Sequence, residues 1–171
     1  MPPPDSSEAH AVALAESIAE AVTGSTLRIA VAESLTSGAI AARLGRAPNA
    51  SEWFAGGVVA FTTEARHRVL ELGSGPLISA RAAEQMATSV ARLLGANLTL
   101  SVTGVPGPDE QDGQAVGTIF IGVHSPHGEL HVAERQLGGS PDEIVDSAVV
   151  AALRLLEARV DALIQQSARS H

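Results

Sequence analysis

Short apolar runs alternate along this chain with segments of helical periodicity, and this alternation restricts the possible folds more than any other feature. Apolar runs over residues 27–32, 56–61 and 97–102 have the length and composition of strands buried on both faces. Apolar residues recur at helical spacing over residues 8–22, before the first of these runs. Strands that alternate with helices favour a sheet covered by helices on both sides.

Further helices are expected from about residue 36 and over residues 63–72, and a turn is expected over residues 48–51. Ser79 precedes another helical segment that runs to about residue 94. Its hydroxyl can accept a hydrogen bond from a free N–H group of the first turn, so we expect Ser79 to be an N-cap.

The C-terminal third follows another pattern. Runs over residues 116–124 and 129–136 flank Ser125-Pro126-His127-Gly128, which indicates a β-hairpin. Pro141 suits the first turn of a helix that is predicted to reach residue 164. We therefore expect an α/β fold, a three-layer α/β/α sandwich with a mixed, mostly parallel sheet that ends in a β-hairpin and a long C-terminal helix. One domain is expected over residues 8–166, between disordered segments 1–7 and 167–171.

Charge and composition exclude several classes of function. The chain has 19 Asp and Glu against 11 Lys and Arg, a net charge of −8, and only 2% aromatic residues. It thus lacks both the basic stripe and the stacking rings that nucleic-acid binding requires. Without cysteine it has no disulfide, thiolate nucleophile or Cys-ligated zinc. Because no secretion signal or membrane-spanning run is recognisable, we expect a cytoplasmic protein with no membrane partner.

A first candidate site is the turn that follows the first strand. It holds the carboxylate of Glu33 and the hydroxyls of Ser34 and Thr36, with Ser37 and Gly38 next. In open α/β sheets, ligands bind beyond the carboxyl ends of the strands, and a helix N-terminus presents free N–H groups that suit a phosphate. The alternative is equally open: Ser34 or Thr36 can simply cap the following helix.

Two more candidate sites follow strands. The loop from Thr103 to Asp109 is rich in Gly and Pro, so its backbone can approach a ligand closely; the alternative is an ordinary connecting loop. The segment 61–67 carries Arg66, which can bind a phosphate or carboxylate with two hydrogen bonds. The alternative for Arg66 is a solvated helix charge paired with Glu64 or a later acid.

His124, His127 and His131 fall within eight residues and invite a metal interpretation. They are expected on a strand end, a turn and the returning strand, with only Glu129 as a nearby carboxylate. We therefore favour the alternative in which they hold no metal.

Three motifs occur in order and resemble those of the CinA C-terminal domain family. Residues 31–38 resemble its AESCTGG motif, residues 57–66 its GVVAYSNEAK segment, and residues 102–108 with 116–118 its TGIAGP…KPVGT segment. The resemblance extends over about residues 11–156. It implies a nicotinamide-nucleotide amidase, which hydrolyses nicotinamide mononucleotide to nicotinic acid mononucleotide and ammonia. It also implies no metal or organic cofactor, a phosphate-bearing nucleotide as ligand, and a homo-oligomer, often a dimer.

The resemblance assigns roles to individual residues. Ser34 becomes the nucleophile, N–H groups near Thr36 to Gly38 bind phosphate or an oxyanion, and the loop Gly104 to Pro108 closes over the nucleotide. The predicted substrate-binding residues are Thr36, Ser37, Gly38, Phe61, Thr63, Thr103, Gly104, Gly107 and Pro108.

Departures from the family motifs concentrate at this pocket. The family lysine that activates the serine is Arg66, and the family tyrosine is Phe61. Other departures are Leu35 for cysteine, Ser37 for glycine, Gln114-Ala115 for Lys-Pro, and the loss of two arginines near residues 139–145. An arginine binds anions but cannot serve as the base.

Without the family lysine, another group has to act as the base, or the chain has another function. Glu33 can accept the serine proton if it is sufficiently buried, whereas His67 points about 100° away from its helical neighbour Arg66. Besides an amidase with an altered substrate, the sequence allows a catalytically silent domain that binds a nucleotide or protein, and a purely structural oligomer subunit.

Overall fold

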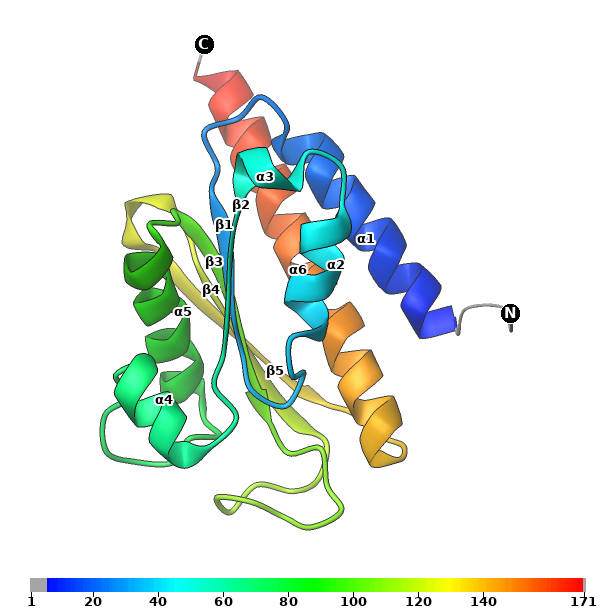
Figure 1. The fold of residues 1–171 in the computed structure, drawn as a ribbon, viewed down its shortest axis with the longest axis vertical. Coiled ribbons are helices and arrows are strands. Elements are labelled where there is room, and N and C mark those ends of the chain that lie inside the picture. The colour runs from blue at the N-terminus through cyan, green and yellow to red at the C-terminus, as the bar shows by residue number, and fades with distance from the viewer. Residues whose placement is uncertain (1–5, 171) are drawn as a thin grey trace.

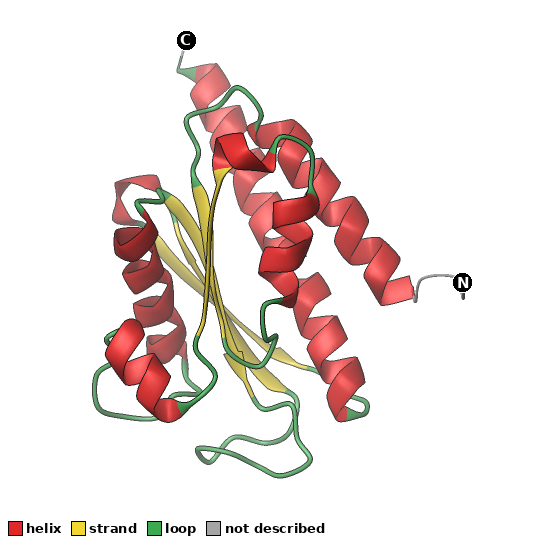
Figure 2. Cartoon of the chain, viewed as in Figure 1, coloured by secondary structure: helices red, strands yellow, loops and turns green. Residues whose placement is uncertain are grey.

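The computed structural model describes residues 6–170, which form three layers (Figure 1). A central sheet separates α1, α2 and α6 on one face from α4 and α5 on the other (Figure 2). The helices are α1 (Ser6–Val22), α2 (Ala39–Arg46), α3 (Ala50–Trp53), α4 (Thr63–Val69), α5 (Ala80–Leu94), a 3₁₀ turn η1 (Pro126–Gly128) and α6 (Pro141–Arg169). The strands are β1 (Ile29–Glu33), β2 (Phe54–Val59), β3 (Leu98–Gly104), β4 (Thr118–His124) and β5 (Leu130–Gln136).

The sheet has the strand order β2-β1-β3-β4-β5. Strand β1 pairs in parallel with β2 and β3, whereas β4 is antiparallel to both β3 and β5. The expected mixed sheet, hairpin and long last helix are therefore confirmed, but the sheet is not mostly parallel, since two of the four strand pairs in residues 6–170 are antiparallel. The carboxyl ends of β1, β2 and β3 meet at the lower edge of the sheet in Figure 1.

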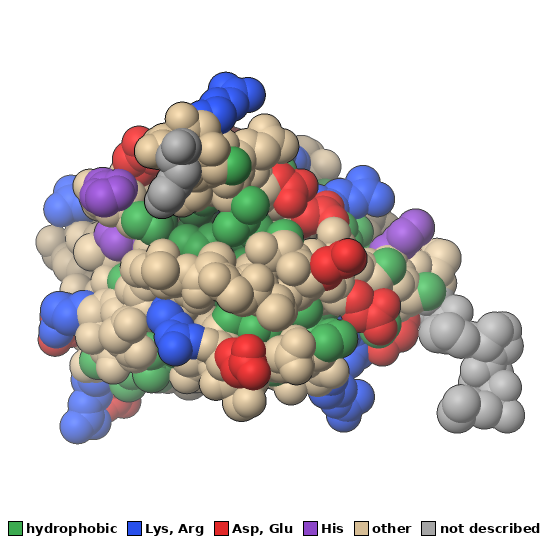
Figure 3. All heavy atoms as spheres, turned by 90° about the horizontal axis from the view of Figure 1, so that it is seen from above, with side chains coloured by type: hydrophobic (Ala, Val, Ile, Leu, Met, Phe, Trp, Pro, Cys, Tyr) green, Lys and Arg blue, Asp and Glu red, His purple; other side chains and the backbone are tan. Residues whose placement is uncertain are grey.

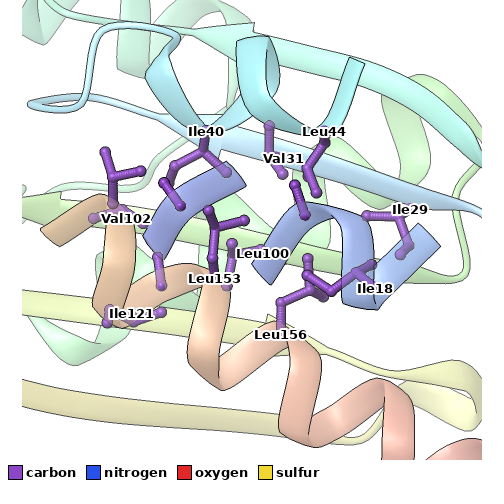
Figure 4. Packing of buried hydrophobic residues seen from close by; sticks show 14 of the residues in the cluster. Ile18, Ile29, Val31, Ile40, Leu44, Leu100, Val102, Ile121, Leu153 and Leu156 are labelled. Carbon is purple, nitrogen blue, oxygen red and sulfur yellow. The ribbon is translucent and has the colours of Figure 1, made fainter. Parts of the chain in front are cut away.

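Alternating side chains of β1 supply both cores. Ile29 and Val31 pack with α1, α2 and α6, and Figure 4 shows them among Ile18, Leu100 and Leu153. Ala30 and Ala32 point to the other face, toward α4 and α5. Each fully buried Ile or Leu contributes roughly 1.5–3 kcal/mol, so this double burial explains why the strand reads as a continuous apolar run.

Hydroxyl groups bind β3 to the segment that forms α5. Thr99 Oγ1 donates to the carbonyl of Ala87 at 2.6 Å, and Ser101 Oγ donates to the carbonyl of Ala83 at 2.6 Å. On the neighbouring strand, a Cβ added at Gly122 would lie 2.6 Å from the Ala83 carbonyl oxygen. Helix α5 therefore lies very close to the sheet, which requires small residues on both sides of the contact.

Helix α2 begins at Ala39 because a carboxylate from the preceding strand caps it. The fully buried Glu33 accepts hydrogen bonds from the N–H groups of Ile40 at 3.0 Å and Ala41 at 2.9 Å. Gly38 is the N-cap residue, with φ 95°, and no side chain at that position forms the cap. The bonds satisfy two N–H groups of the first turn and place negative charge at the positive end of the helix.

Several element bounds differ from the sequence-based expectation. The helix predicted from residue 36 starts three residues later, because residues 34–38 form the turn over the Glu33 cap. The turn predicted over residues 48–51 contains the short helix α3, and β2 begins at Phe54 rather than residue 56.

The predicted disordered ends also need correction. Ser6 and Ser7 belong to α1, and α6 continues to Arg169, so most of the predicted tail is helical. Residues 1–5 and 171 lie outside the described residues. Within residues 6–170, no helix combines the length and apolar character that are needed to cross a membrane.

We predict that Glu33→Gln lowers the free energy of unfolding by about 3 kcal/mol, because a charge-assisted bond is lost and an amide N–H faces a backbone N–H. Urea unfolding followed by circular dichroism measures the loss. The matched control is Glu16→Gln on the exposed side of α1, which should change stability by less than about 0.5 kcal/mol. Equal unfolding midpoints for both variants would contradict the capping role.

Candidate active site

Ser34 lies where the carboxyl ends of three parallel strands meet. Its N–H group donates to the carbonyl of Val102 in β3 at 3.2 Å, and the N–H group of Ala60, just after β2, donates to the carbonyl of Glu33 at 2.9 Å. The side chain is fully buried, and Ser34 Oγ has no hydrogen-bond partner in the described chain. A buried hydroxyl without a partner is uncommon in folded proteins and is often a mark of function.

Glu33 is the last residue of β1, and its side chain caps α2. The alternation of β1 puts Glu33 on the same face as Val31, toward α2. Both carboxylate oxygens of Glu33 are bound to backbone N–H groups. The structure thus assigns both oxygens of Glu33 to the cap of α2, and its role as acceptor of the serine proton stays a prediction.

Arg66 is buried beside the same strand ends. From helix α4, its Nε atom donates to the carbonyl of Ala60 and its Nη2 atom to the carbonyl of Phe61, both at 3.3 Å. Nη1 is buried and has no partner among residues 6–170. The solvated alternative for Arg66 is wrong: only 6% of the residue is exposed, and Glu64 pairs with Arg68 instead.

Two opposing influences act on the Arg66 guanidinium. Burial lowers the pKa of Arg66 because it penalises the charged form, and the negative charge of Asp112 raises that pKa again. An arginine pKa starts so high that the group keeps its proton at physiological pH. The neighbouring His67 is turned elsewhere, with Nδ1 2.8 Å from the carbonyl oxygen of Leu72. The His67 ring is therefore engaged with the segment that follows α4.

Asp112 is the residue of this site that sequence reasoning missed. It lies in the loop between β3 and β4, and its Oδ2 atom accepts hydrogen bonds from the N–H groups of Leu77 at 2.7 Å and Ile78 at 3.2 Å. The bonds hold the loop against the segment that precedes α5. Along the chain, Asp112 is 35 positions from Leu77 and 34 positions from Ile78, so no local pattern could have indicated these contacts.

Thr36 adds a second buried hydroxyl. It is 2% exposed, and its Oγ1 atom, like Ser34 Oγ, has no partner in the part of the chain described. The alternative in which Ser34 or Thr36 caps the following helix is wrong, because Gly38 is the N-cap residue and Glu33 supplies the acceptor oxygens.

The start of α2 does not fit a phosphate. Ala39 donates to the carbonyl of Thr36 at 2.9 Å, and Ile40 and Ala41 donate to Glu33. A phosphate there would meet occupied N–H groups and a buried carboxylate, which repels it. The N–H groups of residues 39–41 are therefore engaged within the protein, and so is that of Ser37, which donates to the carbonyl of Ser34 at 3.1 Å. The anion site at the N–H groups near Thr36 to Gly38 stays a prediction.

The remaining predicted binding residues divide into two groups. Ser37, with φ 51°, and Thr63, Phe61 and Pro108 are exposed around the buried centre. Phe61 shows 61% of its surface, and it contributes its carbonyl rather than its ring to Arg66.

The second group is engaged within the protein. Thr103 Oγ1 donates to the carbonyl of Leu77 at 2.8 Å. A Cβ at Gly104 would lie 2.4 Å from Ile119, and one at Gly107 would lie 2.9 Å from Val116. These glycines make room for neighbouring protein atoms, which corrects the expectation that they leave space for a ligand.

The loop of residues 105–117 lies at the lower end of the molecule in Figure 1, beyond the carboxyl end of β3. Its ends are paired with each other, since the N–H group of Gly117 donates to the carbonyl of Val105 at 2.8 Å, and its middle is held by Asp112. We call this loop the cover. Because Ser34, Thr36 and Arg66 are all buried, a molecule from solvent reaches them only when a neighbouring segment moves.

The three histidines do not converge. In the hairpin, His124 is opposite Leu130 and His131 is opposite Val123, so the two histidines point to opposite faces of the sheet. Within residues 6–170 no group of three or more metal-ligating side chains gathers. On the face seen in Figure 3, acidic and basic side chains are interspersed and form no continuous basic stripe.

Residues 11–160 match the family model described as the CinA C-terminal domain. A "Putative competence-damage inducible protein" of Desulforamulus reducens is 40% identical over 134 residues, and a "CinA-like protein" of Frankia casuarinae is 41% identical over 133 residues. Each match covers 75% of this chain, but only 32% and 30% of those proteins. The chain therefore spans about a third of the length of these curated relatives.

Solved structures give the same result. A competence-damaged protein (CinA) superfamily protein from Klebsiella pneumoniae superposes with a TM-score of 0.84 at 25% identity, covering 89% of this chain and 98% of that one. The competence/damage inducible protein CihA from Agrobacterium tumefaciens gives a TM-score of 0.82 at 28% identity, covering 87% and 94%. The predicted resemblance is thus confirmed by sequence and by fold: the chain belongs to the CinA C-terminal domain family.

Proposed function

We propose that this chain is an amidohydrolase that hydrolyses the carboxamide of a nicotinamide nucleotide, with Ser34 as the nucleophile. The observation that carries the proposal is the buried, unpartnered Ser34 hydroxyl at the meeting point of β1, β2 and β3. It occupies the serine position of the family motif. Arg66 binds the carbonyl of Ala60, whose N–H group donates to the carbonyl of Glu33, and its unpartnered Nη1 atom is a donor for the negative charge that develops during amide hydrolysis.

The proposed reaction has two stages. Ser34 Oγ attacks the carboxamide carbon, the carbonyl oxygen becomes negatively charged, and Arg66 stabilises that charge. The hydroxyl proton passes to the leaving nitrogen, the C–N bond breaks and ammonia departs. Water then hydrolyses the resulting ester, which releases the acid and restores the hydroxyl. Because a guanidinium cannot accept the proton, this site works without a protein base and is expected to be slow.

A second candidate is a catalytically silent domain that binds the nucleotide. Two observations favour it. Arg66 occupies the position of the family lysine, and no group in residues 6–170 accepts a hydrogen bond from the Ser34 hydroxyl. Thermal stabilisation by nicotinamide mononucleotide without ammonia release would support this second candidate, because a ligand that binds only the folded state raises stability.

Ammonia release from nicotinamide mononucleotide tests the first candidate. We predict turnover by the wild type, and a loss of at least about a thousandfold in Ser34→Ala because the attacking oxygen is absent. Ser17→Ala, on the exposed side of α1, is the control and should keep the wild-type rate. Equal rates for the wild type and Ser34→Ala would rule out Ser34 as the nucleophile.

Restoring the family residues tests the explanation for slow turnover. The double variant Arg66→Lys with Phe61→Tyr supplies a base that can lose its proton and a hydroxyl beside it. General base catalysis contributes about a hundredfold or more, so kcat for ammonia release should rise by at least that factor. An unchanged kcat, in a variant that keeps the wild-type melting temperature, would show that the missing lysine does not limit the reaction.

A further inference from the structure

Arg66 is a buried cation that lacks a direct counter-ion. Its side chain takes part in no ion pair in the described residues, and its Nη1 atom has no hydrogen-bond partner there. Two of its nitrogen atoms bind only neutral backbone carbonyls, those of Ala60 and Phe61. A buried charge is costly unless it is paired, so this arrangement favours the arrival of an anion.

Asp112 balances the charge only in part. It acts on Arg66 through its negative charge, but its Oδ2 atom is already bound to the N–H groups of Leu77 and Ile78. The carboxylate therefore holds the cover in place and leaves the Nη1 atom unbound. An anionic group of a ligand can supply the direct contact that Asp112 does not make.

Buried donors without a partner in residues 6–170 occur in Arg66 and in the turn that follows β1. Arg66 Nη1 carries N–H groups and no acceptor, and the hydroxyls of Ser34 and Thr36 each have a proton that is given to no partner in residues 6–170. A carboxylate presents acceptor oxygens on both sides, whereas a carboxamide presents one oxygen and an N–H₂ group. A carboxamide can turn its oxygen to the guanidinium, as the proposed reaction requires, but that oxygen is a neutral acceptor. A carboxylate oxygen makes a charge-assisted hydrogen bond and is therefore the stronger partner for Arg66.

We propose that Arg66 is a specificity-determining residue that makes this pocket bind the carboxylate product of the reaction more tightly than the carboxamide substrate. This inference rests on the proposed function for the identity of the two ligands. The reaction would then be restrained by its own product, which must leave the guanidinium before a new amide can bind. A lysine at the same position relieves the restraint when it loses its proton.

The test compares nicotinic acid mononucleotide with nicotinamide mononucleotide, which differ only in the carboxylate and the carboxamide. Titration calorimetry uses the full chain carrying Ser34→Ala, which prevents turnover. The acid is expected to bind at least about tenfold more tightly than the amide, because a charge-assisted hydrogen bond is the stronger one. In Arg66→Met on the same background the preference should disappear.

Two further variants make the result specific to Arg66. Arg68→Met removes an exposed cation from the same helix and should keep the preference. Asp112→Asn neutralises the competing carboxylate and retains an acceptor oxygen, so it should strengthen binding of the acid, and it tests the proposal even if Arg66→Met does not fold. Asp112→Asn with unchanged or weaker binding of the acid would overturn the proposal.

The outcomes separate this inference from the proposed function. Equal affinities for acid and amide, binding of neither, or a preference that persists in Arg66→Met would each overturn the inference, whatever the wild type does with the amide. A tenfold preference for the acid in a protein that releases no ammonia would leave the inference standing and remove the proposed function.

Discussion

The two hydrogen bonds from Glu33 to the start of α2 are the interaction on which the rest of the site depends. They hold the last side chain of β1 in the layer of α2, and Ser34 is the first residue of the turn that follows. They also occupy the helix N-terminus that such a turn would otherwise offer to a phosphate. The anion-binding capacity of this sheet edge therefore passes to Arg66 in α4, across the strand ends from α2.

Replacing the family lysine by Arg66 is not a conservative change, because Arg66 is buried and its guanidinium is bound to neutral backbone carbonyls. A lysine in the same place is a flexible point charge that can release its proton, whereas the guanidinium spans two backbone carbonyls and stays charged. The substitution exchanges a proton acceptor for a fixed positive potential. Such a potential favours ligands and intermediates that carry negative charge, and it places the chemistry of proton transfer on other groups.

The sequence predicted those features that depend on neighbours in the chain. As an N-cap, the Ser79 side chain accepts a hydrogen bond from the N–H group of Ala82, and Pro141 is the first residue of α6. The apolar runs form strands of a mixed sheet. The sequence did not predict the features that depend on contacts between segments far apart in the chain. Glu33 was interpreted as a potential base because its capping role is visible only once α2 folds back over β1, and burial of Arg66 and the bonds of Asp112 depend on which loops cover the strand ends.

The complete burial of Ser34 has a kinetic meaning. A hydroxyl on an open surface reacts at a rate that its chemistry determines, but this one has to be uncovered first by the movement of a neighbouring segment. The frequency of that movement sets an upper limit on the rate of any reaction at Ser34, whatever the acid–base chemistry. The same ceiling governs any reagent directed at the serine, so two compounds of very different intrinsic reactivity would modify the protein at similar rates.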